Sequence, residues 1–499
     1  MEHIVTAIAG STTPEALSAM LLGSIVGIVF GAIPGLTYTM ALALVMPFTF
    51  GMAQVPAIGL LLATYIGGMT GGCISAILIG IPGTPSTAAT VIDGYPMAKK
   101  GQASLACGTS VVASAFGGLF SLLIMIVSVE VIARVAIAFG PAEIFALVVF
   151  GLSTICGLSD RSLLRGIIGG VIGLMLTTIG QDSLDGVARL TFGSTTMLQG
   201  IDIVVAMVGL FAIPQVISTL AEYFHGGAKP VDPQSVKVEL PSWRLLWQNF
   251  SLMVRTSALG TVVGLVPGAH GPVAAFLAYD HAKRFSKDPE SFGKGDIRGV
   301  IAPECANHSV TGGAMIPMLS LGFPGDPATA LILGGLMIHG LQPGPLLFTE
   351  HPDIVYTIYV EIIIGYLMVC VMQLYGVRLF VRTLMVPSHL LAVGIMVMCV
   401  VGSYAIRNSF LDVYVMLGIG LLGYILQRVR IPVTPIILGL VLGGTMEREF
   451  RTALLMSEGD FSVFYTSPTA MLFFGLTIVI FAVHVIGQRR GRKLRRQEA

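Results

Sequence analysis

The sequence predicts an all-α polytopic membrane protein with about ten to twelve transmembrane helices. Of the 499 residues, 54% are hydrophobic and only 11% are charged, and the mean hydropathy is +0.86. Soluble domains carry about 25% charged residues, so a chain this poor in charge cannot cover a water-facing surface. In addition, apolar stretches of about 20 residues, the length of a membrane-spanning helix, recur along the chain.

The apolar stretches form two sets. The first set lies near 17–47, 57–95, 105–128, 137–158, 163–181 and 201–221. The second set lies near 252–279, 299–340, 354–377, 389–406, 411–427, 431–445 and 468–487. Pro–Gly pairs interrupt two stretches in each set, at Pro34, Pro82, Pro267 and Pro324. Helices are expected to break there, because proline lacks an N–H donor and glycine allows turns closed to other residues.

This pattern divides the chain into four parts. They are a first membrane repeat (1–225), a polar linker (226–248), a second membrane repeat (249–488) and a basic tail (489–499). The tail follows the last span directly. Because basic residues beside a span are retained in the cytoplasm, the C-terminus is predicted to be cytoplasmic.

Two sequence blocks occur once in each half. GIVFGAIPG, from Gly27 to Gly35, returns as GTVVGLVPG from Gly260 to Gly268. GIPGTPSTA, from Gly80 to Ala88, returns as GFPGDPATA from Gly322 to Ala330. The order is kept and each block contains a Pro–Gly pair, so the halves are predicted to be homologous repeats.

The charges of the loops indicate how the repeats are oriented. After the first block, residues 47–57 contain no Lys or Arg, whereas the second copy is followed by Lys283, Arg284, Lys287, Lys294 and Arg298. After the second block the bias reverses, with Lys99 and Lys100 in the first half and no Lys or Arg in 340–353. Equivalent loops on opposite sides of the membrane predict inverted-topology repeats.

The four breaks predict a binding site. Unwound backbone at membrane depth is tolerated only where it is buried in protein or lines a wet cavity. Restarting helices attract anions, and unwound carbonyls and hydroxyls can hold Na⁺. The alternative is that the prolines only shape the helices. The candidate substrate-binding residues are Pro34, Gly35, Thr37, Pro82, Gly83, Thr84, Ser86, Thr87, Pro267, Gly268, Asn307, Pro324, Gly325 and Thr329.

Asp326 lies in the second break motif, where the first copy has Thr84. It could coordinate Na⁺ or carry a proton, or it could simply cap the restarting helix. The candidates for the coupling-ion site are Asp326, Thr84 and Thr311. Glu304 and His308 lie just before Thr311. Four isolated ionisable residues are expected in packing or interfacial positions, namely His339, Glu361, His389 and His484.

Two long segments resemble those of the large membrane subunit of the tripartite tricarboxylate transporters, the TctA-like family. They are GGCISAILIGIPGTPSTAATVIDGYPMAKKGQ, from Gly71 to Gln102, and APECANHSVTGGAMIPMLSLGFPGDPATALILGGLMIHGLQPGPLLF, from Ala302 to Phe348. The resemblance implies a secondary transporter subunit in the bacterial inner membrane, with Na⁺- or H⁺-driven uptake of di- or tricarboxylates such as citrate. It also implies two partners, a small four-helix membrane subunit and a periplasmic substrate-binding protein.

Two positions depart from the family's pattern. His308 stands where a second Asn is usual after Asn307, and Asp326 stands where a small residue such as Ser is usual. Both lie near the predicted site, so the substrate or the coupling ion can differ from the family's namesake.

Other function classes fit the sequence less well. A passive channel or a non-transporting multipass scaffold is the main alternative, although the intramembrane polar residues cluster at the breaks. An enzyme is not expected, since HExxH and GxxxxGK[ST] are absent and Asp326 has no second Asp in the matched motif. The sequence lacks a CxxC pair, which would suggest a metal site, and it lacks a basic patch interleaved with aromatic residues, which would suggest nucleic-acid binding. Apart from Na⁺ or H⁺ as coupling ion, no cofactor is expected.

Overall fold

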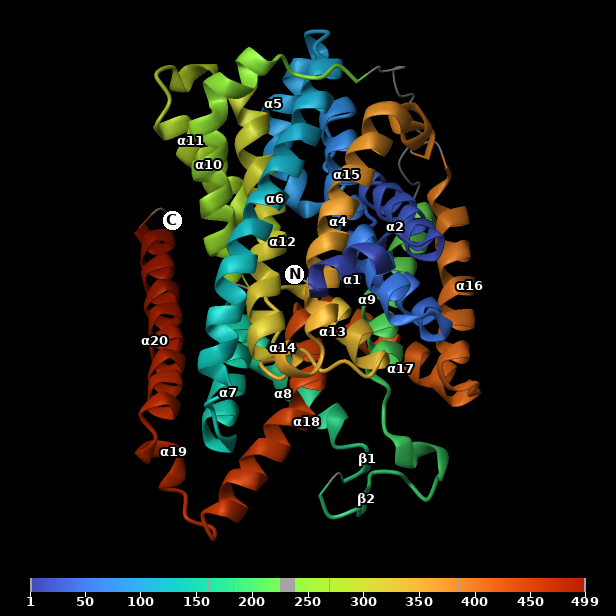
Figure 1. Ribbon diagram of the computed structural model, residues 1–499, viewed down its shortest axis with the longest axis vertical. Helices are drawn as coiled ribbons and strands as arrows, with labels where there is room; N and C mark the ends of the chain where they lie inside the picture. The colour runs from blue at the N-terminus through green and yellow to red at the C-terminus, as the bar shows by residue number, and fades with distance from the viewer. Residues whose placement is uncertain are drawn as a thin grey trace. The chain divides into compact units, whose positions relative to one another are not determined.

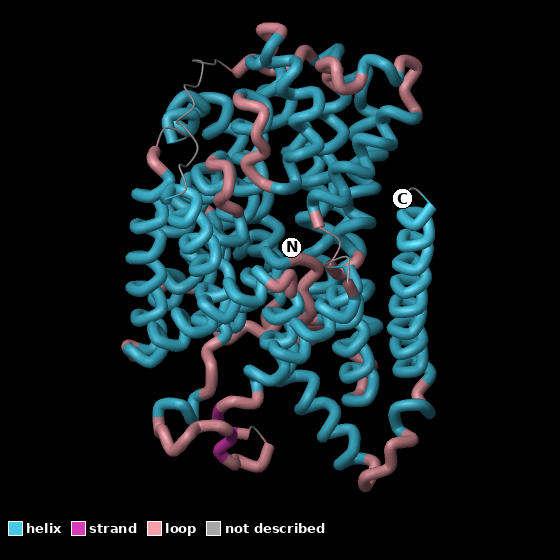
Figure 2. Tube along the Cα trace, turned by 180° about the vertical axis from the view of Figure 1, so that it is seen from behind, coloured by secondary structure: helices cyan, strands magenta, loops and turns pink. Residues whose placement is uncertain are grey.

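α-Helices make up most of the computed structural model (Figure 1). The structure describes residues 2–158, 162–182, 184–224, 238–268, 270–383 and 386–497. Within these residues there are twenty α-helices, and the strands β1 (Gly180–Gln181) and β2 (Ala188–Arg189) form one short antiparallel hairpin (Figure 2). The predicted all-α class is confirmed.

Contacts divide the chain into two compact units. Unit 1 comprises Met1–Ala133 and Phe211–Asn408, and unit 2 comprises Arg134–Leu210 and Ser409–Ala499. The helices of unit 1 are α1 (Glu2–Ser11), α2 (Pro14–Ala32), α3 (Tyr38–Val45), α4 (Gln54–Leu78), α5 (Ala88–Lys99), α6 (Ala103–Ala136, which ends in unit 2), α10 (Trp243–Leu265), α11 (Gly271–Arg284), α12 (Arg298–Leu321), α13 (Pro327–Ile338), α14 (Leu347–Glu350), α15 (Pro352–Thr383) and α16 (Ser388–Arg407). The helices of unit 2 are α7 (Pro141–Leu158), α8 (Leu163–Thr177), α17 (Phe410–Arg428), α18 (Val433–Met456), α19 (Val463–Thr466) and α20 (Pro468–Gln497), and α9 (Ile203–Phe224) is shared. Short 3₁₀ turns cover Met46–Gly51, Pro85–Thr87, Thr196–Gln199 and Pro289–Ser291.

Seven helices among the described residues are long and apolar enough to cross a membrane, namely α2, α4, α6, α9, α15, α16 and α17. Large apolar side chains such as Val127 on α6 and Leu367 on α15 are exposed. Helices this apolar that still expose large side chains need lipid as their solvent, which makes the chain a multi-pass membrane protein. By contrast, the window of α4 that could span a membrane is buried along its whole length, so α4 forms the centre of unit 1.

All four predicted helix breaks are confirmed. α2 stops before Pro34, α4 before Pro82, α10 before Pro267 and α12 before Pro324. The first block turns at matched glycines, Gly35 with φ 91° and Gly268 with φ 86°. Residues with a side chain rarely adopt such positive φ values, which explains glycine at these two positions.

The structure also contains helical segments that the sequence did not predict. α1 precedes the first predicted span, and α10 begins at Trp243, earlier than the span expected near 252. The Ser242 hydroxyl accepts a hydrogen bond from the Leu245 backbone N–H and so caps α10. Exposed Trp243 and Trp247 suit a membrane interface, which hydropathy alone does not detect. The predicted linker lies outside the described residues up to position 237.

The two ends of unit 1 differ in their loops. α5 and α13 lie toward opposite ends (Figure 1). At the α5 end, the Lys100 side chain donates to the Lys294 carbonyl at 2.5 Å, so the two basic loops meet there. At the α13 end, the Gln54 side chain donates to the His339 carbonyl at 3.0 Å. Matched loops from the two halves therefore reach opposite ends, the arrangement that inverted repeats predict.

Candidate functional site

Close helix packing brings the breaks together. In α2, a Cβ atom added at Gly23, Gly27 or Gly31 would collide with backbone carbonyl oxygens of α4. In α10, a Cβ at Gly264 would come within 2.7 Å of the Val310 carbonyl oxygen of α12. Small residues allow helices in a membrane to pack this closely. The first block therefore joins α2 to α4, and its second copy joins α10 to α12.

Backbone hydrogen bonds then hold the break segments, between the two breaks in the second half and from a break to α4 in the first half. The Gly268 N–H donates to the Gly325 carbonyl at 2.8 Å. In the first half, the Gly83 N–H donates to the Gly72 carbonyl at 3.3 Å. These bonds use polar backbone groups that broken helices would otherwise leave unpaired in the membrane.

One contact between the halves is made by Tyr65 on α4. Its hydroxyl donates to Asp326 Oδ2 at 2.8 Å, and its ring lies 5.7 Å from that of Tyr38 between ring centroids. Asp326 Oδ1 accepts hydrogen bonds from the backbone N–H of Thr329 at 2.7 Å and from its hydroxyl at 2.8 Å. Asp326 therefore caps α13, one of its two predicted roles, and both of its carboxylate oxygens are engaged.

The repeat relates this contact to a second one, from α12 of the second half to the break motif of the first half, and the residues there are different. In the register that matches Gly80 with Gly322, Asn307 corresponds to Tyr65 and Thr84 corresponds to Asp326. In the register that matches Gly27 with Gly260, Gly271 corresponds to Tyr38. In this second contact, an amide therefore replaces the Tyr65 phenol and a hydroxyl replaces the Asp326 carboxyl group. The position that matches Tyr38 has no side chain.

Asn307, Gly271, Ser86 and Thr84 form the amide cluster. A Cβ added at Gly271 would lie 3.0 Å from the Ser86 Cβ and would collide with Asn307 Oδ1, so the amide points at the start of α11. The Ser86 and Thr84 hydroxyls are 3.0 Å apart. Asn307 is 1% exposed, and neither its Oδ1 nor its Nδ2 has a hydrogen-bond partner among the described residues.

The amide cluster suits an anion better than the Tyr65–Asp326 contact does. Burying an amide without a partner costs free energy, so Asn307 is expected to bind something in the working protein. The start of α11, a helix of 14 residues, carries the positive end of the helix dipole. At the other contact, the charge of Asp326 repels a carboxylate and the Tyr38 ring fills the space.

A second set of buried polar side chains lies on α12, on both sides of Asn307 in the sequence. Glu304 accepts hydrogen bonds from the Thr90 hydroxyl at 2.5 Å and from the Ser114 hydroxyl at 3.0 Å. His308 Nδ1 is 3.4 Å from the Tyr366 hydroxyl. The predicted ion-site residue Thr311 belongs here, since its hydroxyl lies 3.4 Å from the same Tyr366 oxygen.

The remaining predicted site residues lie at the breaks as caps or backbone turns. Thr37 caps α3 by accepting from the Met40 N–H at 3.2 Å. The Thr87 hydroxyl donates to the Thr84 carbonyl at 2.9 Å, which shapes the turn before α5. Three residues of these contacts are not among the predicted ones, namely Tyr38, Tyr65 and Gly271. The repeat register could have identified Tyr65, since it is the counterpart of the predicted Asn307, whereas Tyr38 and Gly271 match only each other.

Hollows in unit 2 are poor sites for a carboxylate. A cavity of about 150 Å³ lies between α7, α8 and α18, and its lining is almost wholly apolar. A hollow of about 360 Å³ nearby includes Glu447, whose charge would repel an anion. Neither contains a predicted site residue.

Comparisons with known proteins identify a family and two relatives. Residues 17–438 match the family described as the tripartite tricarboxylate transporter TctA family. An uncharacterized 52.8 kDa protein of the TAR-I ttuC′ 3′ region in Agrobacterium vitis is 35% identical over 480 residues, 94% of each chain. A second protein of that organism, from the TAR-II ttuC′ 3′ region, is 36% identical over 234 residues, which cover 47% of this chain and 97% of its own. No solved structure matches. The chain belongs to the tripartite tricarboxylate transporter TctA family.

Proposed function

We propose that this subunit carries out cation-coupled uptake of a di- or tricarboxylate and that the amide cluster binds a carboxylate group of the substrate. The observation that carries the proposal is the buried amide of Asn307, which points at the start of α11 and has no hydrogen-bond partner among the residues that the structure describes. Its Nδ2 would donate to one carboxylate oxygen. The Ser86 and Thr84 hydroxyls would donate to the other oxygen, and the positive end of the α11 dipole would favour the negative charge.

The site is closed in the described arrangement. Asn307, Thr84 and Ser86 are each 1% exposed. A substrate can reach them only when elements around the breaks move apart, first on one side of the membrane and then on the other. Inverted repeats provide such alternating access, because the two arrangements are related by exchanging the conformations of the halves.

The partners follow from the family. Its members belong to tripartite systems, so the chain works with other subunits. We propose that these are a small four-helix membrane subunit and a periplasmic substrate-binding protein that delivers the carboxylate. We further propose that the chain resides in the bacterial inner membrane with its C-terminus in the cytoplasm, that Na⁺ or H⁺ is the coupling ion, and that the chain uses no other cofactor and catalyses no reaction.

The test is uptake into proteoliposomes. The chain would be reconstituted with the small subunit and loaded binding protein, and labelled citrate and other di- and tricarboxylates would be supplied under a Na⁺ or an H⁺ gradient. Uptake above the equilibrium level under one gradient is the expected result. If the substrate only equilibrates under both gradients, the proposal is wrong and the chain is a passive channel.

The amide cluster is tested in the same assay by Asn307→Ala. A hydrogen bond to a charged group contributes about 1.5–3 kcal/mol, so this variant should raise the half-saturating substrate concentration about 10- to 100-fold. The matched control is Tyr65→Phe at the equivalent position, which should leave that concentration within about threefold. An unchanged value for Asn307→Ala would exclude the amide cluster as the carboxylate site.

A further inference from the structure

Glu361 is a buried carboxyl group outside the break segments. It lies within α15, a span of 32 residues, and is 0% exposed. Neither of its oxygens has a hydrogen-bond partner among the described residues. The sequence predicts an isolated residue in a packing or interfacial position, and the burial of Glu361 excludes the interfacial one.

Gly59 makes the room that this carboxyl occupies. A Cβ added at Gly59 on α4 would lie 3.0 Å from Glu361 Oε1 and 2.7 Å from Met20 Cγ on α2. One turn further along α15, a Cβ at Gly365 would lie 3.0 Å from Ile66 Cδ1 of α4. The carboxyl therefore sits in an apolar slot between α15, α4 and α2.

No described cation lies beside this carboxyl. α15 packs against α1, α2, α4, α6 and α14, and its Tyr366 contacts His308 on α12. Among the described residues, no Lys, Arg or His lies within ion-pair distance of Glu361, and His3 on α1 pairs with Asp353. The acidic and phenolic groups of these helices include Glu15 on α2, Tyr65 on α4, Glu130 on α6, Glu350 on α14 and Tyr359 on α15, and their other cationic groups are Arg134 on α6 and Arg378 and Arg382 in the last part of α15.

An ionised carboxylate in such a slot is strongly disfavoured, because burial removes its hydration and nothing replaces it. The group is therefore neutral and holds a proton as long as α15 and α4 stay packed. When the slot opens to water, the carboxyl can ionise and transfer its proton to a water molecule, and it is reprotonated from water before the slot closes again.

We infer that Glu361 is a proton-binding site of the transport cycle, so that H⁺ is the coupling ion. The inference rests on the proposed function. α4 links the two sites, since it packs against Glu361 through Gly59 and also carries Tyr65 and the break at Pro82. Movement of α4 that opens the breaks would also change the access of water to Glu361.

The first test measures the proton without any substrate. Infrared spectra of the purified full-length protein in lipid, at pH 7, would be compared with those of Glu361→Gln. The wild-type spectrum should contain a carboxylic-acid C=O band that the variant lacks. The control Glu15→Gln alters an exposed carboxylate and should retain the band. If Glu361→Gln leaves the band unchanged, Glu361 is ionised and the inference is wrong.

The second test measures coupling in proteoliposomes at zero membrane potential. With one proton per substrate, a gradient of one pH unit supports about tenfold accumulation. Glu361→Gln should bring substrate only to the equilibrium level, while substrate exchange across the membrane continues. Glu361→Asp, which keeps a protonatable group, should accumulate substrate and serves if the Gln variant does not fold.

Tenfold accumulation by Glu361→Gln, or uptake by the wild type that follows only a Na⁺ gradient, would overturn the coupling role. Failure of the proposed function itself is distinguishable. In that case the wild type itself would not accumulate substrate under either gradient, and the infrared band alone would decide whether Glu361 holds a proton.

Discussion

At the scale of the residue, the break motif has two forms with different chemistry. Asp326 and Thr84 occupy matched positions, yet Asp326 binds Tyr65 and caps α13 whereas Thr84 contacts Ser86 beside the Asn307 amide, which has no partner among the described residues. With a carboxyl group at one contact and neutral donors at the other, the two contacts would not be equivalent for the anionic substrate that we propose.

Removing the Asp326 side chain should therefore destabilise the protein more than neutralising it. Asp326→Ala loses the cap, at a cost of about 1 kcal/mol, and leaves the buried Tyr65 hydroxyl without its acceptor, at a cost of about 1–3 kcal/mol. Asp326→Asn keeps a side-chain oxygen that can cap α13 and a polar group that can pair with the Tyr65 hydroxyl. Thermal unfolding in detergent should show a clearly lower midpoint for the Ala variant, and equal midpoints would contradict the capping role.

At the scale of the element, the glycines of the first block determine how near two helices can come. Gly27 and Gly31 lie against backbone carbonyls of α4, and Gly260 and Gly264 lie against those of α12. The adjoining Pro–Gly pair then stops each helix where the opposing break begins. The block thus joins a packing surface to a helix end, which is why both features recur together.

Gly31→Ala should be destabilising, because its Cβ would collide with the Gly68 carbonyl and α4 is too buried to shift freely. Overpacking of this kind costs about 1–3 kcal/mol. The control is Gly394→Ala on α16, where a Cβ would have no neighbour within 4 Å and alanine favours the helix. Unfolding midpoints in detergent should fall for Gly31→Ala and stay equal or rise for the control.

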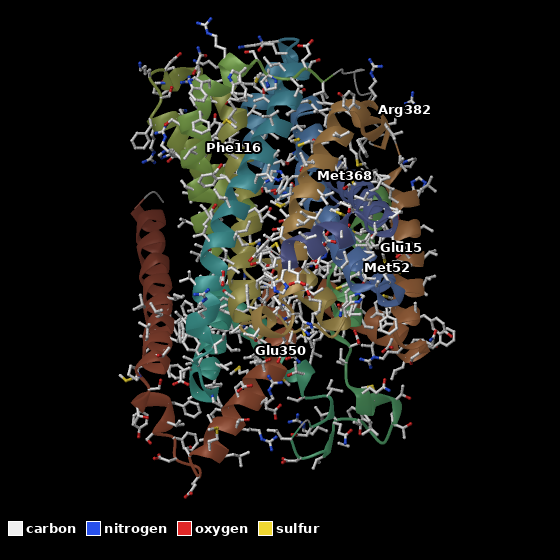
Figure 3. All side chains as sticks on the ribbon, viewed as in Figure 1. Glu15, Met52, Phe116, Glu350, Met368 and Arg382 are labelled. Atoms are coloured by element: carbon white, nitrogen blue, oxygen red, sulfur yellow. The ribbon has the colours of Figure 1, made fainter. Side chains whose placement is uncertain are left out.

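At the scale of the whole molecule, charge separates the two ends of unit 1. Three backbone N–H groups of the loop after α11, those of Gly293, Gly295 and Asp296, donate to Asp93 Oδ1 at 2.7–2.9 Å and so fix this basic loop to α5. Arg382 lies toward the same end and Glu350 toward the other (Figure 3). Because Lys and Arg are retained in the cytoplasm, the α5 end is expected to face it.

Thiol labelling tests this orientation. Lys287→Cys and Glu350→Cys place single exposed thiols at the two ends of unit 1, and Glu498→Cys places one in the tail. A membrane-impermeant reagent should label Glu350→Cys in intact spheroplasts, and it should label the other two only in inside-out vesicles. The unsubstituted protein is the control for its native cysteines. Labelling of Lys287→Cys in spheroplasts would reverse the proposed topology.

The membrane class, the four helix breaks and the register of the repeat can be recognised from the sequence. Hydropathy, the missing N–H of proline and the free φ of glycine act within a few residues, so these features do not require knowledge of the fold. Which polar residues meet depends instead on tertiary packing. The sequence singles out Asn307, but its contact with Gly271 and Ser86 depends on how the two halves pack. The sequence presents Glu361 as isolated because its slot at Gly59 comes from a helix some three hundred residues earlier, and only packing determines whether a carboxyl group is exposed to water.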